Sequence, residues 1–226
     1  MVARALAMSA VFKELRDTAI EQILEIASLR RYSSRACIST SASATDDVLL
    51  VVAGCVEVSC VSASGGKHVL AVEGAGEVMA LVRLLPGALP KYDYFVHPAT
   101  VLLHLPAAAF REVLDREPML WRDVAMLALR RHRESIETLR RLALGDLRDN
   151  VVQLLLKLSD VYLRGGQLQG VIPLPQHQIA CMLGVSRQTL NKELRVLADQ
   201  GLVAPQYGQL QICDLGSLRR IGSSLR

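Results

Sequence analysis

The chain has 226 residues, of which 51% are hydrophobic, and it carries a formal net charge of +4 at pH 7 with a pI of about 8.9. This length is enough for one large domain or two modest ones, each with a buried core. No apolar run reaches the roughly 18 residues that a membrane span needs, and charges interrupt the start of the chain, where a secretory signal would be apolar. We therefore expect a cytoplasmic protein without a membrane span, whose mild positive charge permits an anionic partner without requiring one.

The first half of the chain changes from helical to strand periodicity. Residues 1–28 have the apolar spacing of one or two short amphipathic helices. Between Tyr32 and Leu105, short apolar runs (VLLVVAG, CVEVSCV, HVLAVEG and TVLLHL) are separated by glycine, serine and aspartate turns. Apolar and polar residues alternate from Val56 to Cys60, which is the periodicity of a strand. Several short strands at this spacing predict a small antiparallel barrel or roll.

From Ala107 the apolar residues recur with helical spacing. The pattern predicts one short helix and then a long helix from about Met119 to Leu144. Gly145 is expected to stop the long helix in the left-handed conformation, and Asp146 is expected to cap the next helix.

The long helix carries two apolar stripes. One recurs at alternating steps of four and three, as in a coiled-coil seam about 27 Å long; its members are Ala125, Leu129, His132, Ile136, Leu139 and Ala143. This stripe favours a symmetric dimer. The second stripe, formed by Leu120, Val124 and Leu127, is what a helix on its own domain's core would show, and both interpretations can hold together.

For the last part of the chain, residues 146–226, the sequence predicts a helix, a Gly165-Gly166 turn, an extended VIPLP segment, two helices and a hairpin. The hairpin, LVAPQYGQLQIC, is expected to turn near Tyr207 and Gly208. The two helices, QHQIACMLG and RQTLNKELRVLADQ, are joined by a short turn. This order of elements predicts a winged helix-turn-helix.

Three small residues favour a tight turn between these two helices. Ala180 permits the helices to cross closely, Gly184 tolerates a positive φ, and Ser186 is a natural N-cap for the second helix. On that helix Leu190, Leu194 and Leu197 share one face at steps of four and three.

The opposite face gathers long polar side chains at the end of the helix that enters a major groove. Arginine can bind guanine through two acceptors, glutamine and asparagine can bind adenine in the same way, and lysine can contact guanine or phosphate. The residues predicted to bind DNA are Ser186, Arg187, Gln188, Thr189, Asn191, Lys192 and Arg195. No carboxylate lies between Ser186 and Lys192 to repel phosphates.

This layout resembles the Crp/Fnr superfamily of bacterial transcription regulators over roughly residues 22–220. The segments that carry the resemblance are IACMLGVSRQTLNKELRVLADQGLV and LVVAGCVEVSCVSASGGKHVLAVEGAGEV. The resemblance implies an α+β fold in three parts. Residues 1–117 would form N-terminal helices and an effector-sensing antiparallel β-roll of the cyclic-nucleotide-binding jelly-roll type. Residues 118–145 would form a dimerisation helix and hinge, and residues 146–226 a winged helix-turn-helix. It further implies a homodimer that binds an inverted-repeat DNA site, with RNA polymerase as a further partner.

The chain departs from the family pattern in both halves. In the family's Ser-Arg-Glu-Thr motif, Gln188 replaces the glutamate. Glutamate accepts a hydrogen bond from cytosine, whereas glutamine can pair with adenine. Lys192 stands where arginine is usual. Leu81 stands at the carboxylate of the family's ribose-binding Gly-Glu-Leu segment, and Lys91 lies where an arginine would hold the cyclic phosphate. We therefore do not expect cyclic AMP as the effector, and we keep Leu81, Arg83 and Lys91 as candidate effector-pocket residues.

Other cofactors remain as alternatives. An iron–sulfur cluster is not expected, because Cys37 alone lies near the region where the FNR branch clusters its cysteines. A haem- or gas-sensing variant stays open, with His68, His97, His104, His132, Cys37, Cys55 and Cys60 as candidate ligands. At its position in the seam, His132 would bring two protonatable rings together at a dimer axis.

An enzyme is not expected, because the sequence holds no phosphate-binding loop, no His-Glu-x-x-His motif and no Gly-x-Ser-x-Gly motif. Its five cysteines include no Cys-x-x-Cys pair, which argues against a zinc site. A hypothesis of a different class is a dimeric regulatory barrel that docks a protein partner through its C-terminal helices. Steep salt dependence would distinguish DNA binding from such docking.

Overall fold

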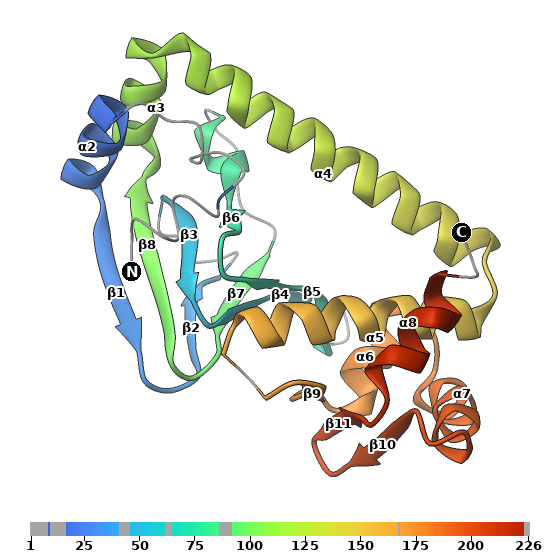
Figure 1. Ribbon diagram of the computed structural model, residues 1–226. Coiled ribbons are helices and arrows are strands. Elements are labelled where there is room, and N and C mark those ends of the chain that lie inside the picture. Colours follow the sequence, from blue (N-terminus) through green and yellow to red (C-terminus); the bar gives the residue numbers. More distant parts are fainter. Residues whose placement is uncertain are drawn as a thin grey trace. The chain divides into compact units, whose positions relative to one another are not determined.

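The computed structural model describes residue 9 and residues 17–40, 46–61, 65–85, 92–166 and 168–223, and Figure 1 shows its ribbon. The chain forms two compact units, residues 1–60 with 73–133 and residues 61–72 with 134–226. Of the predicted N-terminal helices, α2 (Asp17–Ile26) is confirmed, and the segment before it lies outside the described residues except for Ser9.

Within the described residues, eight strands form the predicted β-roll. They are β1 (Ser28–Tyr32), β2 (Ala36–Ser39), β3 (Asp47–Ala53), β4 (Cys55–Val61), β5 (Lys67–Gly74), β6 (Val78–Met79), β7 (Asp93–Val96) and β8 (Thr100–Pro106). One sheet has the order β1-β8-β3-β6 and the other has the order β2-β7-β4-β5. The β1–β8, β3–β8 and β4–β7 pairs are antiparallel, so the expected antiparallel roll is confirmed. A short 3-10 helix, η1 (Leu81–Leu84), follows β6.

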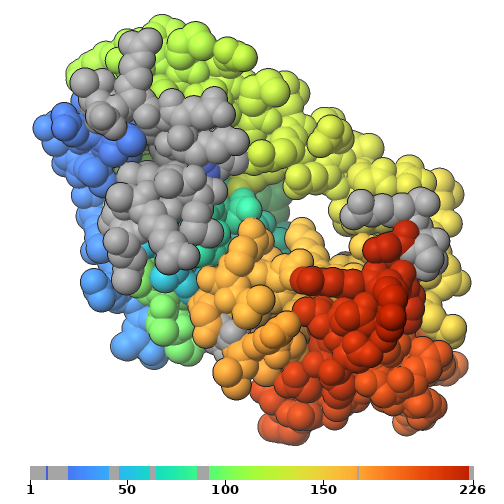
Figure 2. Space-filling model, viewed as in Figure 1, coloured from blue at the N-terminus to red at the C-terminus, as the bar shows by residue number. Residues whose placement is uncertain are grey.

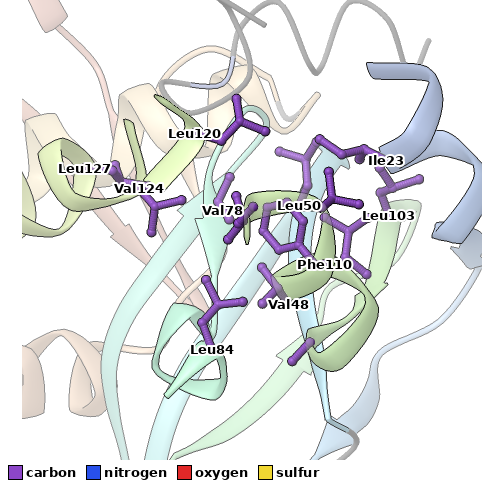
Figure 3. Packing of buried hydrophobic residues seen from close by; sticks show 14 of the residues in the cluster. Ile23, Val48, Leu50, Val78, Leu84, Leu103, Phe110, Leu120, Val124 and Leu127 are labelled. Atoms are coloured by element: carbon purple, nitrogen blue, oxygen red, sulfur yellow. The ribbon is translucent and has the colours of Figure 1, made fainter. Parts of the chain in front are cut away.

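Alternation along β8 separates two apolar clusters. Leu103 and its alternate neighbours pack against α2 and α3 (Ala107–Arg116), around the fully buried Phe110 (Figure 3). Leu102 belongs instead to a second cluster that includes Leu49 and Tyr94. Burying each large apolar side chain stabilises the fold by roughly 1.5–3 kcal/mol, and the apolar run of β8 contributes to both clusters because alternate residues point to opposite faces.

The long helix α4 spans Pro118–Leu144, as predicted to within a residue of its expected start. Its stripe of Leu120, Val124 and Leu127 is buried in the first cluster (Figure 3). The predicted seam residues are all exposed in the single chain: Ala125, Leu129, His132, Ile136, Leu139 and Ala143. The helix therefore uses one stripe for its own core and leaves the other open.

The expectation for Gly145 is wrong, because this glycine does not adopt a positive φ. Its amide donates a hydrogen bond to the Arg141 carbonyl at 2.7 Å, and a Cβ atom at position 145 would lie 2.5 Å from that oxygen. The close approach of the backbone, rather than a left-handed conformation, excludes a side chain here. Asp146 caps the next helix as predicted, since its Oδ1 accepts a hydrogen bond from the Arg148 amide at 2.8 Å.

The elements of the C-terminal region occur in the predicted order. They are α5 (Leu147–Arg164), β9 (Val171–Ile172), α6 (Gln176–Met182), α7 (Arg187–Asp199), β10 (Val203–Gln206), β11 (Gln209–Ile212) and α8 (Leu215–Ser223). The strands form a small sheet with the order β10-β11-β9. The VIPLP strand is shorter than expected, because only Val171 and Ile172 pair with β11 before prolines remove backbone donors.

Helix α8 was not predicted from the sequence. Asp214 caps it by accepting a hydrogen bond from the Ser217 amide at 2.9 Å, and the Gly222 carbonyl accepts one from Gln153 of α5 at 2.7 Å. A Cβ atom on Gly222 would lie 2.8 Å from Leu156, so the glycine lets α8 approach α5 closely.

Candidate DNA-binding surface

The turn between α6 and α7 has the geometry that the sequence predicted. Gly184 has a φ of +67°, and Ala180 is 2% exposed where the two helices meet. The Val185 amide donates a hydrogen bond to the Ala180 carbonyl at 3.1 Å, which closes the turn. Ser186 caps α7, because its Oγ accepts a hydrogen bond from the Thr189 amide at 3.1 Å.

Helix α7 divides into a buried face and an outward face. Leu190, Leu194 and Leu197 are at most 1% exposed, so the predicted apolar face is confirmed. Figure 2 shows the helix at the surface of its unit, in orange at the lower right. Burial of three leucines on one side determines which side chains the other side presents to solvent.

Most of the predicted DNA-binding residues lie on the outward face. The exposed ones are Ser186, Arg187, Gln188, Thr189, Lys192 and Arg195. Within the part of the chain that the structure describes, the side chains of Arg187, Gln188 and Lys192 make no hydrogen bond or ion pair. Their donors and acceptors are therefore available to another molecule.

Asn191 differs from these neighbours. It is half-buried, and its side-chain oxygen is inaccessible to solvent and has no hydrogen-bond partner among the described residues. Sequence spacing alone could not separate it from the exposed residues, because it lies at the border of the outward face. Its contact with DNA stays a prediction.

Sequence reasoning did not single out Glu193 of α7 or Arg148 of α5. The Arg148 Nε donates a hydrogen bond to the Glu193 Oε2 at 2.9 Å, which forms an ion pair. The two residues are 45 positions apart, and no local pattern connects them. The pair removes from solvent part of a carboxylate that would otherwise stand beside Lys192.

The hairpin after α7 forms the expected wing. Gln206 pairs with Gln209 across the turn, where Gly208 has a φ of +72°. Tyr207 at the tip is completely exposed. A fully exposed aromatic side chain is available for a partner molecule, although the sequence analysis gave it no role.

Of the three candidate effector residues in the roll, the structure describes Leu81 and Arg83. Leu81, at the position of the expected ribose-binding carboxylate, packs against the apolar cluster. Ala80, which aligns with the glycine of that segment, has a φ of +59°, the left-handed conformation that favours glycine. Lys91 lies outside the described residues. Leu81 therefore offers no hydrogen-bonding group to the ribose hydroxyls of a cyclic nucleotide.

Arg83 is 2% exposed and points into the roll. Its Nη1 donates to the Asp47 carbonyl at 2.6 Å and its Nη2 donates to the Ser39 hydroxyl at 2.7 Å. The guanidinium carbon lies 5.5 Å from the centroid of the Tyr94 ring, close enough for a cation–π interaction. Burial lowers the pKa of Arg83. Arg83 thus joins η1 to β2 and β3, and its role toward an effector stays a prediction.

His104 is the most buried of the histidines among the candidate haem ligands. Its Nδ1 lies 3.0 Å from the Asp47 Oδ2, and its Nε2 lies 3.0 Å from the Tyr32 hydroxyl. Desolvation lowers the pKa of His104, and the hydrogen bond to Asp47 opposes this effect. Because both ring nitrogens have partners, a haem iron would have to displace one of them. In the described ranges, no group of three or more histidine, cysteine, aspartate or glutamate side chains is placed to hold a metal ion.

None of the described helices combines the length and apolarity that crossing a membrane requires. The fold and the α7 surface define a protein class with a β-roll, a long helix and a winged helix-turn-helix.

Comparison with known proteins assigns both halves. Residues 29–117 match the family described as cyclic nucleotide-binding domain, and residues 150–221 match the Crp-like helix-turn-helix domain. A cyclic AMP receptor protein from Thermus thermophilus is 29% identical over 176 residues, which cover 78% of this chain and 79% of that protein.

Solved structures agree with this assignment. The catabolite activator protein of Thermus thermophilus is 27% identical, with a TM-score of 0.53 and coverage of 96% of this chain and 100% of that chain. A transcriptional regulator of the CRP/FNR family from the same organism has a TM-score of 0.70 at 22% identity, and covers 88% of this chain and 100% of that chain. The chain belongs to the Crp/Fnr superfamily of transcription regulators, and its helix-turn-helix is a DNA-binding domain.

Proposed function

We propose that the chain acts as a homodimer, that the two copies of α7 enter successive major grooves of an inverted-repeat DNA site, and that the regulator works without a cyclic nucleotide. The outward face of α7 is the observation that carries this proposal. The side chains of Arg187, Gln188 and Lys192 are exposed and have no partners among the described residues, and they lie within the first turns of a helix whose other face is buried. The N-terminal part of such a helix contacts base edges.

The proposed roles on α7 follow from hydrogen-bonding geometry. Arg187 would bind guanine through its two acceptors, and Gln188 would bind adenine through N6 and N7. Lys192 and Arg195 would contact bases or phosphates further along the helix. Ser186 and Thr189 are bonded to one another at 2.8 Å, and their hydroxyls would face the backbone of the DNA.

The open stripe of α4 supports the homodimer. Leu129, Ile136 and Leu139 are 62%, 52% and 61% exposed, and they repeat at the spacing of a coiled-coil seam. A second copy related by twofold symmetry would cover the same stripe on both chains. In this proposal residues 1–117 sense, residues 118–145 dimerise and act as the hinge, and residues 146–226 bind DNA, with RNA polymerase as a further partner.

The test is selection of duplexes from a randomised pool by the purified chain. The proposal predicts an inverted repeat whose half-site centres are about 34 Å apart, and a binding constant that falls steeply with salt as counterions are released. Lack of any enriched sequence at low salt would contradict the proposal. Weak salt dependence would favour the alternative, in which the C-terminal helices dock a protein.

A further inference from the structure

The ion pair between Arg148 and Glu193 connects the start of α5 to the middle of α7. Glu193 is the first carboxylate of α7, and the next is Asp199 at the end of the helix. Its side chain is 21% exposed and lies beside the buried leucine face, on the flank of the helix. Its Oε2 accepts the hydrogen bond from Arg148 at 2.9 Å.

The position of Arg148 is determined by its own helix. The Arg148 amide donates to the Asp146 cap at 2.8 Å, and the Asn150 side chain donates to the Arg141 carbonyl at 3.0 Å. Val151 and Val152, which follow Asn150 directly, are fully buried. Hydrogen bonds and buried valines therefore fix the first turn of α5 in place. This fixes the backbone of Arg148, whose side chain reaches Glu193 of α7.

This ion pair is expected to add little to the free energy of unfolding. The Arg148 side chain is 46% exposed, and exposed ion pairs contribute little to stability because solvent screens them. Near DNA the situation differs, since the duplex carries one negative charge for about each 1.7 Å of its axis. A carboxylate without a partner, next to Lys192, would repel that charge and reduce the attraction of the neighbouring cation.

We propose that Arg148 is a positioning residue for DNA binding, which acts by holding and neutralising the Glu193 carboxylate so that α7 can approach the phosphates. Arg148 acts through Glu193 and does not itself contact DNA. This inference rests on the proposed function of α7.

The test is a set of binding constants for the duplex that the unmodified chain selects, and for a scrambled duplex at the same salt. Arg148→Ala is expected to weaken binding of the selected duplex by about fivefold or more, because it leaves a carboxylate without its partner. Glu193→Gln is expected to bind as well as the unmodified chain or more tightly. The double variant, Arg148→Ala with Glu193→Gln, is expected to bind like Glu193→Gln alone, and Arg148→Lys is expected to retain most of the affinity because it keeps the charge.

A matched control is the exposed ion pair of Arg116 with Glu112 on α3, whose atoms are 3.6 Å apart. Arg116→Ala removes the same charge outside α4 and the C-terminal region, and it should leave the affinity nearly unchanged. Melting temperatures of all variants show whether Arg148→Ala remains folded; rescue by Glu193→Gln in the double variant is a second indication that it does.

Two results would overturn the inference. An Arg148→Ala variant that binds normally would show that the pair has no effect, and an equal loss in the Glu193→Gln background would show that Arg148 contacts phosphate directly. If the unmodified chain binds no duplex in preference to another, the proposed function fails first and the inference fails with it.

Discussion

The Nδ1 atom of His104 lies 3.0 Å from the Oδ2 atom of Asp47 inside the β-roll. The same aspartate accepts a hydrogen bond from Arg83 through its carbonyl, and the other nitrogen of His104 lies 3.0 Å from the Tyr32 hydroxyl. These hydrogen bonds thus form a connected polar network that joins β1, β8, β3 and η1. Buried polar groups that are mutually bonded fix one arrangement of the strands, because breaking a bond leaves a costly unpaired group.

The first prediction concerns the pH dependence of stability. Desolvation lowers the pKa of His104 below its ordinary value of 6.5, so the folded chain favours the neutral ring and the unfolded chain takes up the proton first. The stabilisation is present above pH 6.5 and is lost as the pH falls through the lowered pKa of the folded state. Denaturant unfolding from pH 8 to 5 should show a steeper loss for the unmodified chain than for His104→Gln. Parallel curves for the two would contradict the prediction.

The second prediction concerns Ala80, which has a φ of +59° at the start of η1. A left-handed alanine is strained by about 1 kcal/mol or more, and glycine relieves that strain. Ala80→Gly should therefore raise the free energy of unfolding by about 1 kcal/mol. Ala107→Gly, in the ordinary conformation of α3, is the control and should lower it. A drop in melting temperature for Ala80→Gly would show that the lost methyl contact outweighs the strain.

The third prediction tests the dimer seam. Ile136 is 52% exposed in the single chain, and burying this exposed half in a twofold interface would contribute roughly 1.5–3 kcal/mol over both copies. Ile136→Glu should therefore raise the dimer dissociation constant at least about tenfold in sedimentation equilibrium. Met126→Glu changes an equally exposed residue outside the seam and should have little effect. Equal dissociation constants for the two variants would place the interface elsewhere.

The fourth prediction concerns the role of Arg187 in DNA binding. Arg187→Ala should cost about 1 to 3 kcal/mol per half-site and relax the preference at one base pair, because a bidentate contact to guanine is lost. Arg164→Ala, which removes an exposed cation at the end of α5, controls for net charge. Binding constants on duplexes substituted at each position measure both effects. A uniform loss on every sequence would mean that Arg187 contacts only phosphate.

The helix-turn-helix could be predicted in detail because its determinants are local. The turn glycine Gly184, the Ser186 cap and the three leucines of α7 lie within 14 consecutive residues, and each acts through its own backbone conformation or helical spacing. The strands of the roll were predictable for the same reason, since they are short apolar runs bounded by turn residues, with alternation from Val56 to Cys60.

The remaining features depend on contacts between distant residues. The spacing of Gly145 suggested a left-handed stop, but the approach of the Arg141 carbonyl decides its conformation. Arg148 and Glu193 meet only because α5 and α7 pack together, and the Asn191 amide turns inward at the border of two faces. The interior position of Arg83 follows from bonds to Ser39 of β2 and Asp47 of β3, which precede it by 44 and 36 residues.

The most direct measurement of the central claim is duplex selection by the unmodified chain and by Gln188→Glu, side by side. If α7 reads base edges, the position contacted by residue 188 should change from adenine to cytosine, because glutamine pairs with adenine N6 and N7 whereas glutamate accepts from cytosine N4. All other positions of the selected site should stay the same. Identical selected sequences for the two proteins would contradict the account.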